Sequence, residues 1–239
     1  KIAEFVRRKI RERVTDPVVA ERLTPRNHCF GTKRVPLESG YYEAYNRENV
    51  ELVDLHATPI ERISLNGIIT TAQTYQLDII VYATGFDAVT GALTRIDILG
   101  EDGTSLKNKW RDGPRTYLGL QIAGFPNLFT LVGAHNAANF CNVPRCIEQN
   151  VEWVTDCIRY LQDNALNRIS ASEAAEEAWR AHCEEVVADT LFTTADSWFM
   201  GANIPGKKRG FLAYGGGLPK YRDKCNEVAS KGYEGFVLE

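Results

Sequence analysis

The stretch from Leu77 to Ala88, LDIIVYATGFDA, constrains the fold more strongly than any other part of the chain. Its first half is a short apolar run, rich in β-branched residues, which is typical of a strand buried on both faces of a parallel sheet. The run ends in the small residues Ala83, Thr84 and Gly85, against which a ligand can lie closely. Because open α/β sheets bind ligands at this carboxyl edge, the sequence predicts an α/β fold with a central strand that ends at a ligand.

The usual phosphate-binding loop is absent from this pattern. No G-x-G-x-x-G follows a strand anywhere in the 239 residues, although that loop is the common anchor for the pyrophosphate of a dinucleotide. A second apolar run, from Asn127 to Gly133, again ends in small residues and predicts a second strand of the same kind. The sequence therefore predicts sheet edges of the kind that bind nucleotides, but without the glycine-rich loop that usually binds the phosphates.

A long amphipathic helix is predicted after the second strand. Asn142 is a candidate N-cap and Pro144 suits the first turn. The predicted apolar face consists of residues at helical spacing, namely Ile147, Val151, Val154, Ile158 and Leu161. The N-terminus of such a helix favours an anionic or carbonyl-bearing ligand. Many α/β proteins have similar helices without a ligand, so this feature alone leaves the function open.

Two local signals predict further elements. Asn66-Gly67 between Ile63 and Ile68 predicts a tight hairpin. Ser170 followed by Glu173 predicts a capping box at the start of another helix.

Charge and hydropathy exclude several classes of partner. A net charge of -3 from 28 basic and 31 acidic residues gives no electrostatic case for nucleic acid or an anionic membrane. No apolar run approaches the ~20 residues of a membrane span, and the first 14 residues read as a charged amphipathic helix rather than a signal peptide. We therefore expect a soluble, cytoplasmic protein with a packed core.

The cysteines and histidines indicate neither disulfides nor a metal site. The six cysteines are spread along the chain without a C-x-x-C, so reduced thiols are expected. The four histidines do not add the spacing of a zinc site, and no metal is predicted. The chain also lacks G-x-S-x-G, H-E-x-x-H and P-loop motifs, which leaves hydrolase and kinase functions without support.

Two segments are candidates for a functional site. A small turn at Gly31-Thr32 delivers the adjacent cations Lys33 and Arg34, although a basic pair on a loop is more often simply solvated. Residues 193–210 carry Trp198 among several glycines and a proline and cannot form one regular element. A long loop of this kind is often a functional lid, and a surface basic patch beside a core tryptophan is the open alternative.

Several motifs in order resemble the carboxyl-terminal portion of the Baeyer–Villiger monooxygenases. They are G-T-K-R at 31–34, G-Y-Y at 40–42 with Y-N-R at 45–47, A-T-G-F-D-A at 83–88, I-E-Q at 147–149, and S-W at 197–198 with G-A-N-I-P-G-K at 201–207. The resemblance covers essentially the whole chain. It implies a flavoprotein that uses FAD and NADPH to insert one oxygen of O2 next to a ketone carbonyl, by way of a C4a-peroxyflavin, giving an ester or lactone.

The resemblance also implies an incomplete pair of domains. The fold class would be α/β, a partial flavoprotein with two Rossmann-like dinucleotide-binding domains that lack their N-terminal halves. Residues 1–86 would be the later part of the NADPH domain, and residues 87–239, with a mobile loop at 193–210, the later part of the FAD domain. The missing N-terminal half of the enzyme, with both glycine-rich loops, would be the partner of this chain.

Site roles follow from the same resemblance. Arg34 matches the catalytic arginine, whose permanent charge stabilises negatively charged oxygen. Lys33 is similar to the residue that meets the 2′-phosphate of NADPH, and Trp198 to the loop residue that closes over the nicotinamide ribose. Val143 and its neighbour Asn142 lie where the family touches the flavin, at a helix N-terminus that favours negative charge on the ring.

One stretch departs from the phenylacetone type of the family. Residues 133–146 look more like cyclopentadecanone monooxygenase, which points to a bulky or macrocyclic ketone. His135 and Arg145 in this stretch are either specificity residues or part of the helix start. Two alternatives to the monooxygenase activity stay open, namely a non-catalytic fragment that binds nucleotide poorly and an N- or S-hydroxylating flavin monooxygenase.

Overall fold

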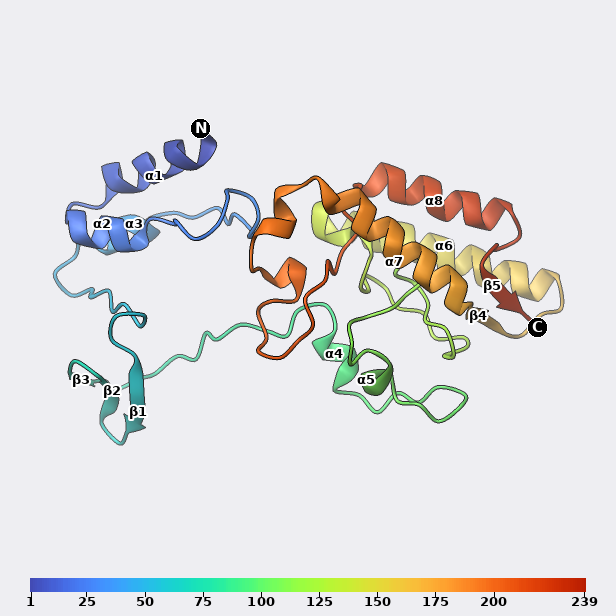
Figure 1. The fold of residues 1–239 in the computed structure, drawn as a ribbon, viewed down its shortest axis with the longest axis horizontal. Coiled ribbons are helices and arrows are strands. Elements are labelled where there is room, and N and C mark those ends of the chain that lie inside the picture. The colour runs from blue at the N-terminus through green and yellow to red at the C-terminus, as the bar shows by residue number, and fades with distance from the viewer. The chain divides into compact units, whose positions relative to one another are not determined.

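The computed structural model describes the backbone of all 239 residues and the side chains of residues 1–137 and 140–239. The chain divides into two compact units, Lys1–Gly85 and Phe86–Glu239 (Figure 1). Among the described residues, no helix combines the length and apolarity that crossing a bilayer requires.

Three short helices form the first half of the first unit. They are α1 (Ile2–Arg13), α2 (Pro17–Leu23) and α3 (Tyr41–Ala44). Asp16 caps α2 through its side chain, which accepts from Val18 N at 2.7 Å, and Pro17 occupies the first turn. The helices pack through a small cluster of Ile10, Val14 and Ala20. Local capping and one apolar cluster therefore hold this part together.

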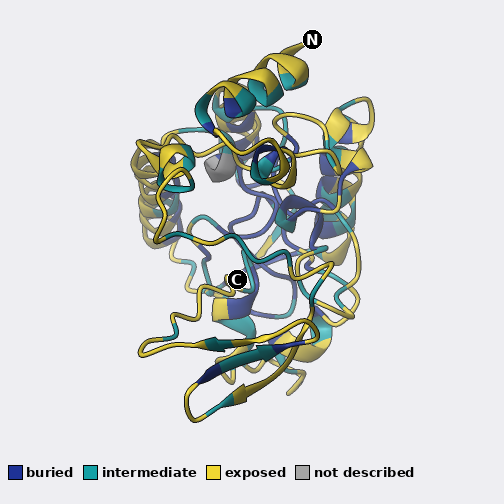
Figure 2. Ribbon diagram, turned by 90° about the vertical axis from the view of Figure 1, so that its left-hand side faces the viewer, coloured by how far each residue is buried: buried dark blue, intermediate teal, exposed yellow. Residues whose placement is uncertain are grey.

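A three-stranded antiparallel meander follows in the first unit, in the order β1 (Ile60–Ser64), β2 (Gly67–Thr70) and β3 (Thr74–Gln76). Ser64 pairs with Gly67, so the predicted hairpin is confirmed. Gly67 has a φ of 149°, and a Cβ there would lie 1.9 Å from Tyr75 O, so only glycine fits this turn. Most meander residues are exposed or intermediate (Figure 2).

The prediction of a central strand at residues 77–82 is wrong. Residues 78–84 form no strand in the structure, and Ile79 and Val81 are 78% and 82% exposed. A strand buried on both faces needs a pairing partner on each side, and the described residues supply none. The apolar run of this stretch therefore remains uncovered.

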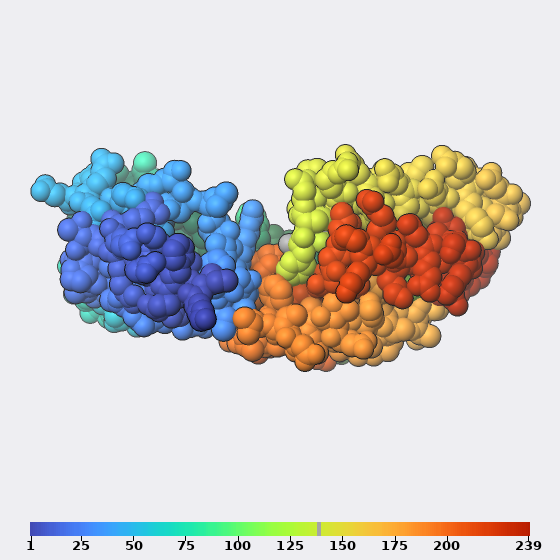
Figure 3. Space-filling model, turned by 90° about the horizontal axis from the view of Figure 1, so that it is seen from above, coloured from blue at the N-terminus to red at the C-terminus, as the bar shows by residue number. Residues whose placement is uncertain are grey.

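The second unit holds the large core. Its elements are α4 (Gly91–Thr94), α5 (Leu106–Lys109), the 3-10 helix η1 (Ala137–Phe140), α6 (Val143–Asp163), β4 (Ile169–Ala171), α7 (Glu173–Ala188), the 3-10 helices η2 (Leu191–Thr194) and η3 (Trp198–Met200), α8 (Leu218–Ser230) and β5 (Phe236–Leu238). The strands β4 and β5 pair antiparallel, with Ser170 opposite Val237. In Figures 1 and 3, α8 lies beside both α6 and α7.

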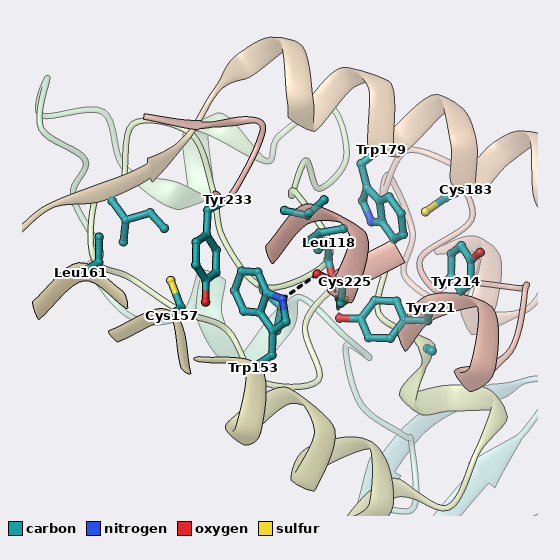
Figure 4. Close-up of a cluster of buried hydrophobic side chains, with 14 residues drawn as sticks. Leu118, Trp153, Cys157, Leu161, Trp179, Cys183, Tyr214, Tyr221, Cys225 and Tyr233 are labelled. Carbon is teal, nitrogen blue, oxygen red and sulfur yellow. Dashed lines mark hydrogen bonds between the residues drawn. The ribbon is translucent and has the colours of Figure 1, made fainter. Parts of the chain in front are cut away.

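Aromatic side chains and cysteines from these three helices fill the core (Figure 4). Trp153 of α6 donates from Nε1 to the carbonyl of Cys225 in α8 at 2.9 Å. Trp179 of α7 stacks on Tyr214 with ring centroids 5.2 Å apart. Tyr221 is fully buried, and its hydroxyl donates to Leu118 O at 2.7 Å. The buried polar tips of these aromatics are thus paired, as burial requires.

The buried face of α6 differs from the predicted one. Of the predicted residues, Leu161 is buried, but Ile147, Val151 and Ile158 are 37%, 42% and 44% exposed. The buried residues are instead Cys146, Gln149, Asn150, Trp153, Cys157 and Leu161. The helix has apolar residues on two faces, and the described residues cover only the one that carries Trp153.

Two other local predictions need correction. Residues 127–133 form no strand, because Asn127 and Val132 both have φ near 57°, which interrupts an extended backbone. The cap of α7 is Ser172, whose side chain accepts from Ala175 N at 3.2 Å. Ser170 cannot be that cap because it belongs to β4.

Candidate functional site

A tightly anchored turn precedes Lys33 and Arg34 in the first unit. Thr32 is 2% exposed, and its backbone N and Oγ1 both donate to Cys29 O, at 3.2 Å and 2.7 Å. Gly31 reaches a φ of 86°, which side-chain-bearing residues rarely adopt. The turn therefore fixes the backbone from which the two adjacent cations project, as predicted from Gly31-Thr32.

Both cations line a cavity of about 610 Å³ within the first unit. Its walls are largely apolar and come from α1, from residues 30–37 and from α3, including Phe5, Phe30 and Val35. Among the described residues, neither Lys33 nor Arg34 has an ion pair or hydrogen bond, whereas Arg13 on the same cavity is bound by Glu38 and Glu43. Within the part of the chain that the structure describes, Lys33 and Arg34 are thus the cations of this wall without a side-chain partner.

His28 lies on the same cavity and remains neutral near pH 7. Burial lowers its pKa, and the positive charges of Lys33 and Arg7 lower it further. The cationic character of the wall therefore comes from the arginines and lysines alone.

The start of α6 is built as predicted. Asn142 is the N-cap and accepts from Arg145 N at 3.4 Å, and Pro144 lies in the first turn. Val143, the first helical residue, is 45% exposed. The helix N-terminus therefore presents Asn142 and Val143 on an accessible surface of the second unit. Of the adjoining stretch, the side chains of Ala138 and Asn139 lie outside the described residues.

The expectation of six reduced cysteines is wrong for one pair. Cys141 and Cys146 form a disulfide across the helix start, with Cα atoms 6.8 Å apart. The chain turns into the helix between them, which brings two cysteines five positions apart together without a C-x-x-C. Of the remaining thiols, Cys29 is exposed and Cys157, Cys183 and Cys225 are buried in the core.

The two open residues near α6 differ in their surroundings. His135 is 3% exposed, its Nδ1 lies 3.2 Å from Thr116 Oγ1, and burial lowers its pKa to about 4. Arg145 is exposed and pairs with Glu148 at 2.7 Å. These surroundings favour a packing role for His135 and a surface role on the helix for Arg145.

The first half of the loop 193–210 is well packed. Phe199 and Met200 are buried in a cluster with Phe211, and Trp198 stacks on Phe199 with ring centroids 3.9 Å apart. Phe140, two residues before Asn142, stacks on Phe199 at 5.4 Å. The structure therefore brings the loop carrying Trp198 next to the start of α6. Sequence reasoning missed this aromatic cluster, although the four phenylalanines at 140, 192, 199 and 211 were a signal for it.

The second half of the loop is tied by side chains. Lys207 Nζ lies 2.5 Å from Asp87 Oδ1 and 2.8 Å from Thr90 Oγ1, and Asn203 Nδ2 donates to Phe86 O at 2.9 Å. Phe86 and Asp87 of the motif A-T-G-F-D-A thus contact the motif G-A-N-I-P-G-K inside the second unit. Sequence reasoning did not connect them, although the opposite charges of Asp87 and Lys207 offered a signal.

The candidate residues therefore fall into two groups. Lys33 and Arg34 share one cavity of the first unit, while Asn142, Val143 and Trp198 belong to the second unit. That the two groups face one ligand stays a prediction.

The chain has relatives among known proteins, although no protein-family model matches it. It is 49% identical over 243 residues to 2-oxo-Delta(3)-4,5,5-trimethylcyclopentenylacetyl-CoA monooxygenase of Pseudomonas putida, covering 99% of this chain and 44% of that protein. It is 46% identical to cyclopentanone 1,2-monooxygenase of Comamonas sp. (strain NCIMB 9872), covering 99% and 44%. It is 42% identical to phenazine N-monooxygenase PhzNO1 of Lysobacter antibioticus, covering 99% and 43%.

Solved structures agree with these relatives. The crystal structure of OTEMO in complex with FAD and NADP (form 4) matches with a TM-score of 0.95 and 48% identity, over 100% of this chain and 44% of that one. An oxidized steroid monooxygenase bound to NADP matches with a TM-score of 0.91 and 46% identity, over 99% and 44%. The chain thus spans less than half the length of the proteins that it matches.

These matches confirm the predicted fold class, a partial α/β flavoprotein fold of the two-domain dinucleotide-binding kind. A Baeyer–Villiger monooxygenase of Pseudooceanicola batsensis is likewise 39% identical over 238 residues. Sequence and structure together assign the chain to the carboxyl-terminal portion of the Baeyer–Villiger monooxygenase family.

Proposed function

We propose that this chain forms the carboxyl-terminal part of an FAD- and NADPH-dependent monooxygenase that inserts one oxygen atom of O2 next to a ketone carbonyl, giving an ester or lactone. The observation that carries the proposal is the position of Lys33 and Arg34, which have no ion pair among the described residues, on a largely apolar cavity. The chain that holds them is nearly half identical to an enzyme of this kind. A solved relative in complex with FAD and NADP supports the two cofactors.

The residues present fit these two groups. Two cations that have no partner among the described residues suit the negatively charged groups of a dinucleotide, and the largely apolar cavity walls suit flat rings. When bound, NADPH supplies the reducing equivalents and the flavin supplies the activation of O2. The exposed N-terminus of α6, with Asn142 and Val143, would bind the flavin and favour negative charge on it.

Each cation has its own proposed role. Arg34 stabilises negative charge on oxygen during the insertion, and it does so without giving up a proton because a guanidinium stays charged at all working pH values. Lys33 binds the 2′-phosphate of NADPH and so selects it over NADH. Trp198 closes over the nicotinamide ribose and excludes water from it.

We further propose that the rest of the full-length protein covers the apolar surfaces that this chain leaves open. They are the run around Ile79 and Val81, which are 78% and 82% exposed, and the α6 stripe of Ile147, Val151 and Ile158. In that assembly residues 1–86 belong to the NADPH domain and residues 87–239 to the FAD domain. The relatives are more than twice as long as this chain, which leaves ample protein for the task.

The test uses the purified full-length protein with FAD, NADPH and 18O2, and mass spectrometry of the products from a series of cyclic ketones. The proposal predicts an ester or lactone that carries one 18O atom and depends on NADPH. NADPH oxidation without any oxygenated ketone product would contradict it. The series ends in steroid and macrocyclic ketones, because we propose a bulky substrate from residues 133–146 and from the steroid monooxygenase match.

A second candidate is oxygen transfer to nitrogen. One relative at 42% identity is a phenazine N-monooxygenase, which favours this alternative over other flavin chemistries. Under the same conditions, an N-oxide from a phenazine and no ester from any ketone would support it instead. The 239-residue chain by itself is proposed to bind nucleotide poorly or not at all and therefore to be inactive. Flavin absorbance in the purified 239-residue chain would contradict the weak binding.

A further inference from the structure

Lys207 is a partly buried cation whose side-chain partners all lie within the second unit. Its side chain is 15% exposed, and that of its partner Asp87 is 27% exposed. Three acceptors surround Nζ: Asp87 Oδ1 at 2.5 Å, Thr90 Oγ1 at 2.8 Å and Ala88 O at 3.4 Å. An ammonium group has three donors, so each has a partner. Such a satisfied charge holds its surroundings in one arrangement, because separating it from Asp87 would leave two partly buried charges without their partners.

The backbone of residues 86–91, which Lys207 contacts, has features that allow this contact. Val89 has a φ of 70°, which is unfavourable for a β-branched residue and persists only where neighbouring contacts impose it. A Cβ on Gly91 would lie 2.5 Å from Asp87 Cβ, so the absence of a side chain there lets Asp87 take its position. Asn203 adds a second link by donating to Phe86 O at 2.9 Å.

The other end of the loop leads directly to Trp198. Gly210 N donates to Met200 O at 3.1 Å and Leu212 N donates to Phe199 O at 2.8 Å, which pairs the two sides of the loop. Arg209 donates to Thr193 O at 2.8 Å and so closes its base. Lys207 and Trp198 therefore belong to one short loop whose two sides are hydrogen-bonded to each other.

We propose that Lys207, with Asn203, is a positioning residue that latches the loop 198–210 onto residues 86–90 and thereby sets the pose of Trp198. The residue touches neither cofactor in this account and acts through the loop. This inference rests on the proposed function only for its catalytic consequence, because the latch itself is a property of the second unit.

The matched variants are Lys207→Met and Lys208→Met in the full-length protein. Lys208 is the next residue, is exposed, and has no ion pair or hydrogen bond among the described residues, so it controls for the loss of a positive charge in the loop. Hydrogen exchange measured by mass spectrometry reports the loop directly and needs no activity. Lys207→Met is expected to speed amide exchange in residues 198–210 by about tenfold, because it removes one partner of a partly buried ion pair. Exchange in α6 and α7 is expected to stay unchanged. Lys208→Met is expected to leave the exchange unchanged.

The KM for NADPH, measured together with the flavin content, distinguishes a positioning role of Lys207 from a purely structural role. Lys207→Met is expected to raise the KM for NADPH by about tenfold or more while the flavin content stays at the parent level, and Lys207→Arg is expected to restore part of the loss. Unchanged loop exchange in Lys207→Met would overturn the latch, and faster exchange with an unchanged KM would overturn its action on Trp198. If Lys207→Met fails to fold, Asn203→Ala serves as the second variant with the same outcomes. A parent enzyme that does not oxidise NADPH would contradict the proposed function, while the exchange experiment would still decide the latch.

Discussion

Acid sensitivity of the second unit should depend largely on His135. This side chain is 3% exposed, and burial lowers its pKa to about 4 from the ordinary value of 6.5. The unfolded chain therefore takes up a proton at a higher pH than the folded chain does. Stability from the neutral ring is fully present above pH 6.5 and is lost as the pH falls toward 4.

The magnitude follows from those two pKa values. At pH 5 the His135 ring is largely protonated in the unfolded chain and largely neutral in the folded chain. This difference lowers the free energy of unfolding by about 2 kcal/mol at pH 5 and by close to zero at pH 7.5. The charge of Arg180 contributes to the lowered pKa after burial, since it also disfavours a positive ring at this position.

The assay is urea unfolding of the 239-residue chain followed by tryptophan fluorescence, because all four tryptophans belong to the second unit. The control is His135→Asn, chosen because asparagine tolerates the φ of 63° found at this position. The parent chain is expected to lose about 2 kcal/mol more than this variant between pH 7.5 and pH 5. An identical pH dependence of the two proteins would refute the argument.

Three further predictions concern other parts of the second unit. Gly91→Ala should lower the free energy of unfolding by roughly 1–3 kcal/mol, because its Cβ would lie 2.5 Å from Asp87 Cβ, and unchanged urea midpoints would contradict this. Peptide mapping of the protein without reductant should find Cys141 linked to Cys146, and mapping after dithiothreitol should find two thiols; alkylation of both before reduction would disprove the link. Val151→Ser should change the free energy of unfolding of the isolated chain by no more than about 0.5 kcal/mol. It should lower that of the full-length protein by more than about 1 kcal/mol, because there the rest of the protein is proposed to cover this face of α6. Equal effects in both proteins would count against that proposal.

Sequence reasoning succeeded where the determinants are local. The N-cap at Asn142 and the hairpin before Gly67 depend on a few neighbouring residues, so their signals are complete in the sequence. The G-T turn before Lys33 is of the same kind. Motifs in family order likewise identified the family and its cofactors.

Sequence reasoning failed where the determinants are distant. The apolar run around Ile79 predicts a central strand, but a strand exists only when other strands pair with it, and the described residues supply none. The face of α6 was assigned from isoleucine and valine, whereas Trp153 and Cys157 are buried instead, because an amphipathic pattern does not say which of two apolar faces meets the core. The contact of Asp87 with Lys207 spans 120 residues, which no local pattern encodes.

The most direct test of the whole account is the ester yield of the full-length Arg34→Ala variant relative to the parent, measured together with flavin content and NADPH oxidation. Removal of a preorganised charge at the reacting oxygen typically costs about 3–4 kcal/mol of transition-state stabilisation. The account therefore predicts that ester formation falls by about a hundredfold to a thousandfold while flavin stays bound. Ester formation at the parent rate in this variant would contradict the role assigned to Arg34.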